Sequence, residues 1–250
     1  MGTNYKNVDR RLLREWEERR KNILSESFIV ESAGNKEERI ARAREDFEYF
    51  ARTYFPHLCK KPCAKFHIEA ARYIKAHPNA RAVFRWPRGH AKSTIMSLII
   101  PLWLLIQEKR EINLMLLVSQ SEDKAKKLLR NLRAELEINP LFISDFGQMA
   151  GGGEWADGEF KTTTGVLFVA VGRGQSPRGL INRGLRPDYI VIDDLDDDEL
   201  VLNPSRVGRA LDWCLSALIG TMAMGRGRFI MVGNLIGLRI PLLYSFRHKR

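Results

Sequence analysis

Two stretches far apart in the chain decide its fold, Phe84-Arg-Trp-Pro-Arg-Gly-His-Ala-Lys-Ser-Thr94 and Tyr189-Ile-Val-Ile-Asp-Asp194. The first predicts a strand, a tight turn and the start of a helix, and the second predicts a buried strand that ends in two carboxylates. Together they contain what nucleoside triphosphate chemistry needs: a phosphate cradle, a cation, a hydroxyl and a carboxylate for magnesium, and a carboxylate to orient water.

The first stretch is similar to the phosphate-binding loop, whose consensus is Gly-x-x-x-x-Gly-Lys-(Ser/Thr). Only Lys92 and Ser93 match it strictly, because Trp86 and Ala91 occupy the positions of the two glycines. The physical requirement is looser, since backbone N–H groups must point at phosphate oxygens with a helix N-terminus behind them. Gly89 can supply a turn with positive φ, and Ala91 is small enough for close approach of a phosphate.

The loop residues predicted to bind the nucleotide are Pro87, Arg88, Gly89, His90, Ala91, Lys92, Ser93 and Thr94. Lys92 is expected to serve the β- and γ-phosphates of ATP, and Ser93 to ligate Mg²⁺. Taken alone, the stretch could equally be a basic loop that opens a helix, with Lys92 merely solvated. The second stretch favours the nucleotide site, because ligands bind at the carboxyl ends of parallel strands.

The two carboxylates of the second stretch have separate predicted roles. Asp193 is expected to ligate Mg²⁺, directly or through water. Asp194 is expected to polarise the attacking water, from a position where related motors have a Glu that is one methylene longer. The acidic residues at positions 196–199 predict an exposed loop at the sheet edge.

Composition limits the class of protein. The chain has 250 residues, 44% of them hydrophobic, which is enough for the core of one large domain. Its net charge of +11 favours a polyanionic partner such as nucleic acid, the alternative being a basic surface with no special partner. No stretch approaches the roughly 18 apolar residues of a membrane span. Three cysteines argue against a disulfide framework and fit a reducing cytoplasm.

One cluster raises the question of a structural zinc site. His57, Cys59, Cys63 and His67 lie close together in the sequence. Their spacing contains no Cys-x-x-Cys knuckle, which favours ordinary packing roles for the two cysteines over metal binding.

Hydrophobic periodicity and turn residues predict the remaining elements. Helices are expected at residues 9–24, 36–54, 66–75, 93–107 with a bend at Pro101, 121–137 and 204–218. Strands are expected at 81–86, 112–118, 189–193 and 228–232, with a hairpin over 159–171 that turns at Thr164-Gly165. Residues 142–159 predict a loop.

This order predicts an α/β fold, a P-loop NTPase of the RecA-like (ASCE) type with a mainly parallel central sheet flanked by helices and an N-terminal helical lead. The reason is that the strand–helix unit 112–137 separates the Lys92 strand from the Asp193 strand, whereas small kinases usually keep those strands adjacent. Asn234 follows the last strand. It predicts either a polar sensor of the γ-phosphate or a plain junction.

Arginines are candidates for stabilising the charge of the transition state. Arg88 lies inside the loop and could act in its own subunit. Arg178 and Arg183 lie with Arg173 and Arg186 in a Gly-rich segment that could project an arginine into a neighbouring subunit. Contact with DNA phosphates or solvent is the alternative for all of them.

Together, these motifs resemble the ATPase domain of the large terminase subunit, the DNA-packaging motor of tailed bacteriophages. The resemblance runs from about Phe50 to Leu243. It rests on the order and spacing of residues 87–94, 118–121, 172–179, 186–194 and 232–234. No single motif among them is decisive.

The resemblance implies Mg²⁺-dependent ATP hydrolysis coupled to translocation of double-stranded DNA into a procapsid in the host cytoplasm. It implies a finger in cis at Arg88 and a finger in trans at Arg183, with Arg178 the competing match. Asn234 would belong to the motif that couples hydrolysis to motion, although the family usually has Gly-Thr there. The implied partners are further copies of the chain in a ring, the portal protein and the small terminase subunit.

The chain is expected to divide into an N-terminal helical region, 1–55, and the ATPase domain, 56–250, with the nuclease domain of a full large terminase absent. Two alternatives remain. Another nucleic-acid-dependent P-loop motor, such as a helicase, would need a second RecA-like domain, for which the chain is too short. A non-hydrolysing DNA-binding assembly module with a degenerate loop stays open because of Trp86 and Ala91.

Overall fold

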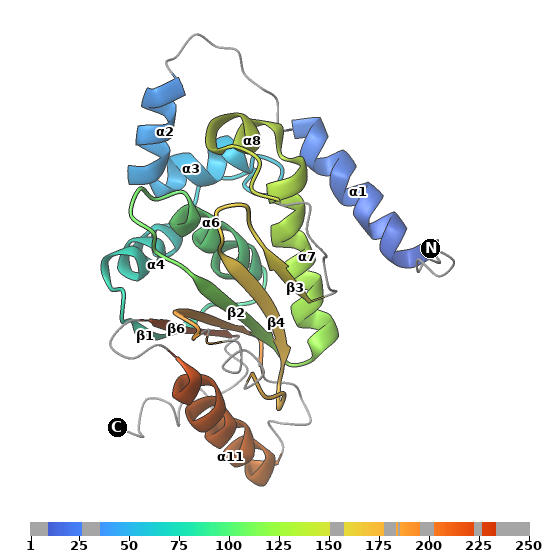
Figure 1. Cartoon of the computed structure of the whole chain (residues 1–250), viewed down its shortest axis with the longest axis vertical. Coiled ribbons are helices and arrows are strands. Elements are labelled where there is room, and N and C mark those ends of the chain that lie inside the picture. The colour runs from blue at the N-terminus through green and yellow to red at the C-terminus, as the bar shows by residue number, and fades with distance from the viewer. Residues whose placement is uncertain are drawn as a thin grey trace.

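A computed structural model describes residues 10–26, 36–150, 158–177, 184, 186–195, 203–222 and 227–233. A sheet runs through the middle and helices flank it (Figure 1). Its strands are β1 (Arg81–Arg85), β2 (Leu114–Ser119), β3 (Glu159–Lys161), β4 (Leu167–Gly172), β5 (Tyr189–Asp193) and β6 (Arg228–Gly233). The helices are α1 (Arg10–Glu26), α2 (Lys36–Glu45), α3 (Phe47–Tyr54), α4 (Lys65–Ala76), α5 (Lys92–Thr94), η1 (Ile95–Ile99), α6 (Ile100–Leu105), α7 (Glu122–Ile138), α8 (Pro140–Phe146), α11 (Pro204–Trp213), η2 (Cys214–Leu218) and η3 (Ile219–Thr221).

The order of the strands across the sheet is β1-β6-β5-β2-β4-β3. Every neighbouring pair is parallel except β3 and β4, which form the predicted hairpin. The mainly parallel α/β sheet is thus confirmed. The strand that lies between β1 and β5 in the sheet is β6 and not β2, the strand of the unit 112–137, which lies on the other side of β5. Register pairs Arg85 with Gly233, and pairs Asp193 with both Val232 and Ser119. The carboxyl ends of these strands therefore share one edge.

The two faces of the sheet bury alternate side chains of the same strands, as the two-residue period of a strand requires. Met115, Leu117 and Val191 belong to the core with α3, α4, α6 and α7. Leu116 and Ile192 belong to the core with α11 on the opposite face. Because both faces are covered, the strands read as continuous apolar runs in the sequence.

Buried charges secure the other edge of the sheet, where the parallel strands begin. Asp188, just before β5, accepts hydrogen bonds from the N–H groups of Asn113 and Leu114 at 2.9–3.0 Å and from Asn113 Nδ2 at 2.6 Å. Arg228, the first residue of β6, is 1% exposed and pairs with Glu111 at 2.7 Å. These contacts fix where three strands start.

Two predictions of local structure were wrong. The single helix predicted over residues 36–54 is two helices, because the Asp46 carboxylate accepts a hydrogen bond from Tyr49 N–H and caps the start of α3. The predicted loop after Pro140 begins with α8. Asn139 ends α7, as expected, but its side chain also accepts from Phe142 N–H and caps α8.

The helix after the phosphate loop is interrupted where a bend was predicted. Residues Ile95–Ile99 form a π-helical turn, in which Ile100 N–H bonds the carbonyl of Ile95. Pro101 follows directly, and its ring would clash with the Ser97 carbonyl in a regular α-helix. The wider turn accommodates the proline within a continuous helical run.

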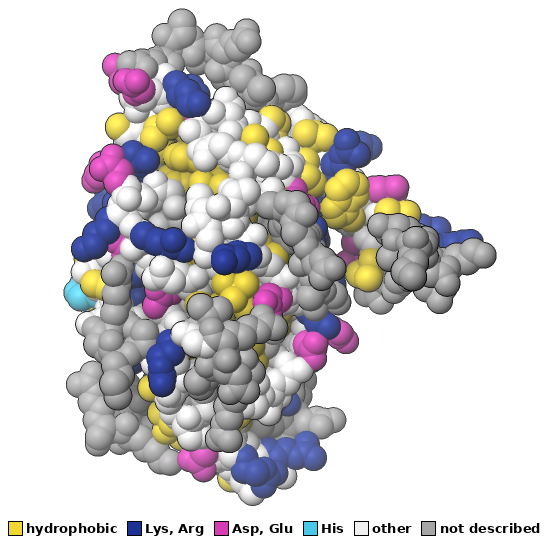
Figure 2. Space-filling view, viewed as in Figure 1, with side chains coloured by type: hydrophobic (Ala, Val, Ile, Leu, Met, Phe, Trp, Pro, Cys, Tyr) yellow, Lys and Arg dark blue, Asp and Glu magenta, His cyan; other side chains and the backbone are white. Residues whose placement is uncertain are grey.

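One face of the molecule is mixed in charge. On the face that Figure 2 shows, Lys and Arg side chains are spread among Asp and Glu side chains instead of forming one basic stripe. Within the described ranges, none of the helices is both long enough and apolar enough to cross a membrane.

Candidate active site

The phosphate-loop candidate connects β1 to the helix that begins at Lys92. Gly89 has φ +79° and Ala91 has φ +51°, so both residues lie in the left-handed region. The helix behind them starts at once, since Ile95 N–H bonds the Ala91 carbonyl at 2.9 Å. Residues 87–91 are exposed, and a Cβ on Gly89 would meet nothing within 4 Å. The loop therefore faces open space with a helix N-terminus behind it.

The first turn of helix α4 packs against the phosphate-loop candidate. His67 Nδ1 accepts from Ala64 N–H at 3.2 Å, which leaves the ring proton on Nε2 to be donated to the His90 carbonyl at 3.0 Å. Phe66 packs its ring 5.1 Å from Trp86 and 5.9 Å from His90. In the sequence, His67 was considered only as a zinc ligand, and its contact with the His90 carbonyl was not predicted.

The two motifs meet at Asp193, which ends β5 and is 1% exposed. Ser97 Oγ donates to its Oδ2 at 3.0 Å, while Oδ1 is buried with no hydrogen-bond partner in the described part of the chain. Burial raises the pKa of Asp193 to about 6. The Ser93 hydroxyl lowers it, the Asp194 charge raises it, and Ser97 and Lys92 lower it. Lys92 and Ser93 are thus brought beside Asp193.

These donors fit a magnesium ion. A buried carboxylate oxygen without a partner, next to a serine hydroxyl, is the kind of oxygen ligand that Mg²⁺ prefers. A cation at this place would also offset the burial of the Asp193 charge. Lys92 is 8% exposed and lies at the same helix end, where it can meet the phosphates.

Asp194 is held in an unusual backbone conformation, with φ +46°. Its N–H donates to the Val232 carbonyl at 3.1 Å. The carbonyl before it, of Asp193, accepts from Ser119 Oγ at 2.9 Å. The carbonyl after it, of Leu195, accepts from Arg173 Nη1 at 2.9 Å. The half-buried side chain of Asp194 thus projects from a turn that is fixed on both sides.

Of the predicted finger arginines and Asn234, the structure describes only Arg88. Arg88 is exposed on the loop. Arg178, Arg183 and Asn234 lie outside the described residues. The strand that precedes Asn234 does reach the loop, because the Gly233 carbonyl accepts from Trp86 N–H at 3.3 Å.

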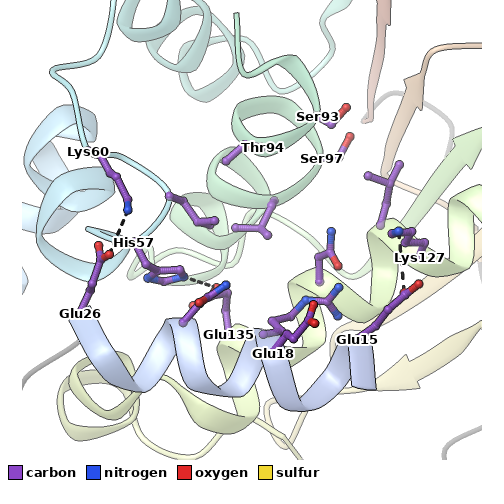
Figure 3. Close-up of a pocket in the computed structure, with 16 residues that line it drawn as sticks. Glu15, Glu18, Glu26, His57, Lys60, Ser93, Thr94, Ser97, Lys127 and Glu135 are labelled. Carbon is purple, nitrogen blue, oxygen red and sulfur yellow. Dashed lines mark hydrogen bonds and ion pairs between the residues drawn. The ribbon is translucent and has the colours of Figure 1, made fainter. Parts of the chain in front are cut away.

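A cavity of about 470 Å³ borders the site, and Ser93, Thr94 and Ser97 line it on that side (Figure 3). Its other walls are formed by α1, α7 and the segment 57–60, and its lining includes a buried pair, His57 Nε2 and Glu135 Oε1, at 2.8 Å. His57 is therefore engaged with Glu135 through Nε2. The described residues contain no group of three or more His, Cys, Asp or Glu side chains that could hold a metal.

Ser97 and Ser119, whose hydroxyls bond Asp193, were not predicted to do so, and Ser119 was considered only as a possible cap of the following helix. Ser97 stands one helical turn after Ser93, a spacing that places both hydroxyls on one face of the helix. That signal is present in the sequence, but serine in an apolar run is common. Ser119 ends a strand, and its partner is known only once β2 and β5 are paired.

Comparison with known proteins gives a fold but no sequence family. No protein-family model matches the chain, and no curated protein matches it. Among solved structures, the crystal structure of the HK97 bacteriophage large terminase is similar, with a TM-score of 0.54 and 14% sequence identity. The match covers 81% of this chain and 40% of that one. The chain therefore has a terminase-like fold and spans well under half of that terminase.

Proposed function

We propose that this chain is a Mg²⁺-dependent ATPase of a DNA-packaging motor, equivalent to the ATPase region of a large terminase. The observation that carries the proposal is Asp193, which lies beside Ser93 and Lys92 and has a buried Oδ1 without a hydrogen-bond partner among the described residues. A purely structural buried carboxylate would have its oxygens satisfied. The terminase-like fold adds the packaging role to the ATPase chemistry.

The chemistry follows from the residues at the sheet edge. The loop N–H groups and the Lys92 ammonium bind and orient the ATP phosphates, and Ser93 and Asp193 hold Mg²⁺. When bound, Mg²⁺ neutralises charge on the β- and γ-phosphates. Asp194 orients the attacking water and accepts its proton. Its fixed turn keeps the carboxylate at one place, which contributes to catalysis by positioning.

The remaining assignments rest on the resemblance to terminases. Arg88 is the finger in cis, and Arg183 or Arg178 the finger in trans, which requires that copies of the chain associate in a ring. Asn234 links the end of β6 to the γ-phosphate. Residues 1–55 form a helical region and 56–250 the ATPase domain. Double-stranded DNA, the portal protein and the small terminase subunit are the partners, in the host cytoplasm.

The test measures phosphate release with Mg²⁺, by wild type and by Lys92→Ala and Asp194→Ala proteins. We expect wild-type turnover and a loss of at least ~100-fold in both variants, because each removes a group that acts on the transferred phosphoryl or its nucleophile. Asp194→Ala should still bind ATP, whereas Lys92→Ala should bind it weakly. Arg209→Ala, an exposed change on α11, is the matched control.

Two outcomes would redirect the proposal. Equal phosphate release by wild type and Lys92→Ala would favour the non-hydrolysing assembly module. DNA binding is tested in the same samples, and its affinity should fall steeply as salt rises, because Lys and Arg contacts to phosphates release counterions. Salt-independent affinity would argue against a DNA motor.

A further inference from the structure

Asp194 lies in the left-handed region of backbone conformation, which is uncommon for a residue other than glycine. Few residues other than glycine adopt a φ of +46°, and such a conformation persists where the surrounding structure holds it. Such positions cluster at functional sites, so what holds this turn matters for whatever chemistry Asp194 performs. The structure identifies the groups that hold it.

Two of the three bonds around the turn come from neighbouring strands. Val232 lies on β6 and Ser119 at the end of β2, and both strands pair directly with β5. The bond to the Leu195 carbonyl is different, because it comes from a side chain at the end of β4, which β2 separates from β5. Arg173 therefore reaches across a strand to hold the residue immediately after Asp194.

The start of that reach is itself fixed. Arg173 N–H donates to the Ser119 carbonyl at 2.9 Å. Gly172, the residue before it, packs so closely against α7 that a Cβ would lie 2.6 Å from Glu122 N. Gly172 N–H also donates to the side chain of Gln175 at 2.6 Å. The backbone that carries the Arg173 side chain is thus held in place, and the residue is half-buried.

We propose that Arg173 is a positioning residue of this site: its guanidinium holds the Leu195 carbonyl so that Asp194 keeps its strained turn. The inference rests on the proposed function only for its effect on hydrolysis. It separates Arg173 from the arginine-finger candidates of the same Gly-rich segment, because Arg173 is engaged within its own subunit. A guanidinium suits this role, since its several fixed donors hold a carbonyl at one geometry.

The first test reads the turn itself, without nucleotide. Hydrogen exchange of the Asp194 amide is measured in wild type, Arg173→Met and Arg173→Lys, with Val191 in the middle of β5 as an internal reference. We expect at least ~10-fold faster exchange at Asp194 in Arg173→Met, unchanged exchange at Val191, and a partial effect in Arg173→Lys, because local opening is separate from global unfolding. Unchanged exchange at Asp194, or equal loss of protection at both amides, would overturn the proposal.

The second test reads hydrolysis in single turnovers. Arg173→Met should lower the rate about 10- to 100-fold while ATP affinity changes less than about threefold, because a small misplacement of Asp194 affects the chemical step. Arg173→Lys should recover part of the rate, and Arg209→Ala should match wild type. Loss of affinity in parallel with the rate would contradict positioning.

Mixing separates positioning from a finger in trans. Arg173→Met protein is mixed with Lys92→Ala protein, which has an intact Arg173 but a disabled loop. We expect no recovery of hydrolysis. Recovery would reassign Arg173 to the neighbouring subunit's site. If wild type itself fails to hydrolyse ATP, the proposed function fails, and the exchange experiment still decides whether Arg173 holds the turn.

Discussion

Asp188 and Asp193 stand at the two ends of the same strand, both buried, and their surroundings are opposite. Asp188 accepts hydrogen bonds on both oxygens from Asn113, and Leu114 adds another, so its charge is fully engaged. Asp193 has one buried oxygen with no partner in the described residues, and burial raises its pKa to about 6. The hydrogen bonds of Asp188 tie strands together, whereas Asp193 retains an oxygen that can accept a further bond.

The two ends of β5 also differ in the backbone conformation around them. At the Asp188 edge the strand starts are tied by ordinary hydrogen bonds and by the Arg228–Glu111 pair. At the Asp193 edge, Ala91 and Asp194 both have positive φ. The two non-glycine residues with positive φ in the described part of the chain thus both lie at the Asp193 edge of the sheet. This is the pattern expected where stability is given up for function.

The largest effect on the free energy of unfolding is expected at Asp188. Asp188→Asn replaces one accepting oxygen by an amide NH₂, which leaves backbone N–H groups facing a donor in a buried place. We expect a loss of roughly 4 kcal/mol in the free energy of unfolding, measured by urea denaturation, because buried donors would lose their charged acceptor. A loss below about 1 kcal/mol would contradict the structural role of Asp188.

The same substitution at the other end is expected to have the opposite sign. The pKa of Asp193 is about 6 in the folded state, above its ordinary 3.8, so the folded state retains a proton that the unfolded state releases. Its contribution to stability is therefore present below pH 3.8 and is lost as the pH rises through about 6. Asp193→Asn should remove this loss and stabilise the metal-free protein at neutral pH by on the order of 3 kcal/mol.

The measurement is the difference in unfolding free energy between Asp193→Asn and wild type, followed across pH without Mg²⁺. The difference should grow as the pH rises towards neutrality. A constant difference, or a destabilised variant at neutral pH, would mean that the Asp193 charge is compensated in the folded state.

The smallest effect is expected at Ala91. Its left-handed conformation costs roughly 1 kcal/mol for a residue with a Cβ, and glycine adopts it freely. Ala91→Gly should therefore stabilise the protein by up to ~1 kcal/mol, as the melting temperature will report, and should leave ATP binding intact. Lower stability would show that the methyl group of Ala91 makes packing contacts that outweigh its strain.

The sequence predicted the Asp193 edge better than the Asp188 edge, and the reason is local pattern. A buried strand that ends in two carboxylates, and a glycine three residues before Lys-Ser-Thr, are visible in short windows. Asp188 follows an Arg-Pro pair and reads as part of a loop. Its donors lie 74 and 75 residues away, so only the pairing of β2 with β5 reveals its role.

Helix boundaries failed for a similar reason. The apolar pattern of residues 36–54 continues through Asp46, and only the cap that Asp46 provides separates α2 from α3. Ser97 and Arg173 were missed as supports of the site because their partners are an aspartate 96 residues away and a carbonyl 22 residues away. Residues that carry chemistry form recognisable motifs, whereas the residues that hold them in place do not.

Strand β6 supplies two consecutive carbonyls to the two halves of the site: Val232 bonds Asp194 N–H, and Gly233 bonds Trp86 N–H at the root of the phosphate loop. The end of β6 therefore holds both halves of the site through its backbone. A displacement of β6 would therefore act on the phosphate-loop candidate and on the Asp194 turn at the same time. The two halves of the site are thus coupled to each other through the backbone of one strand.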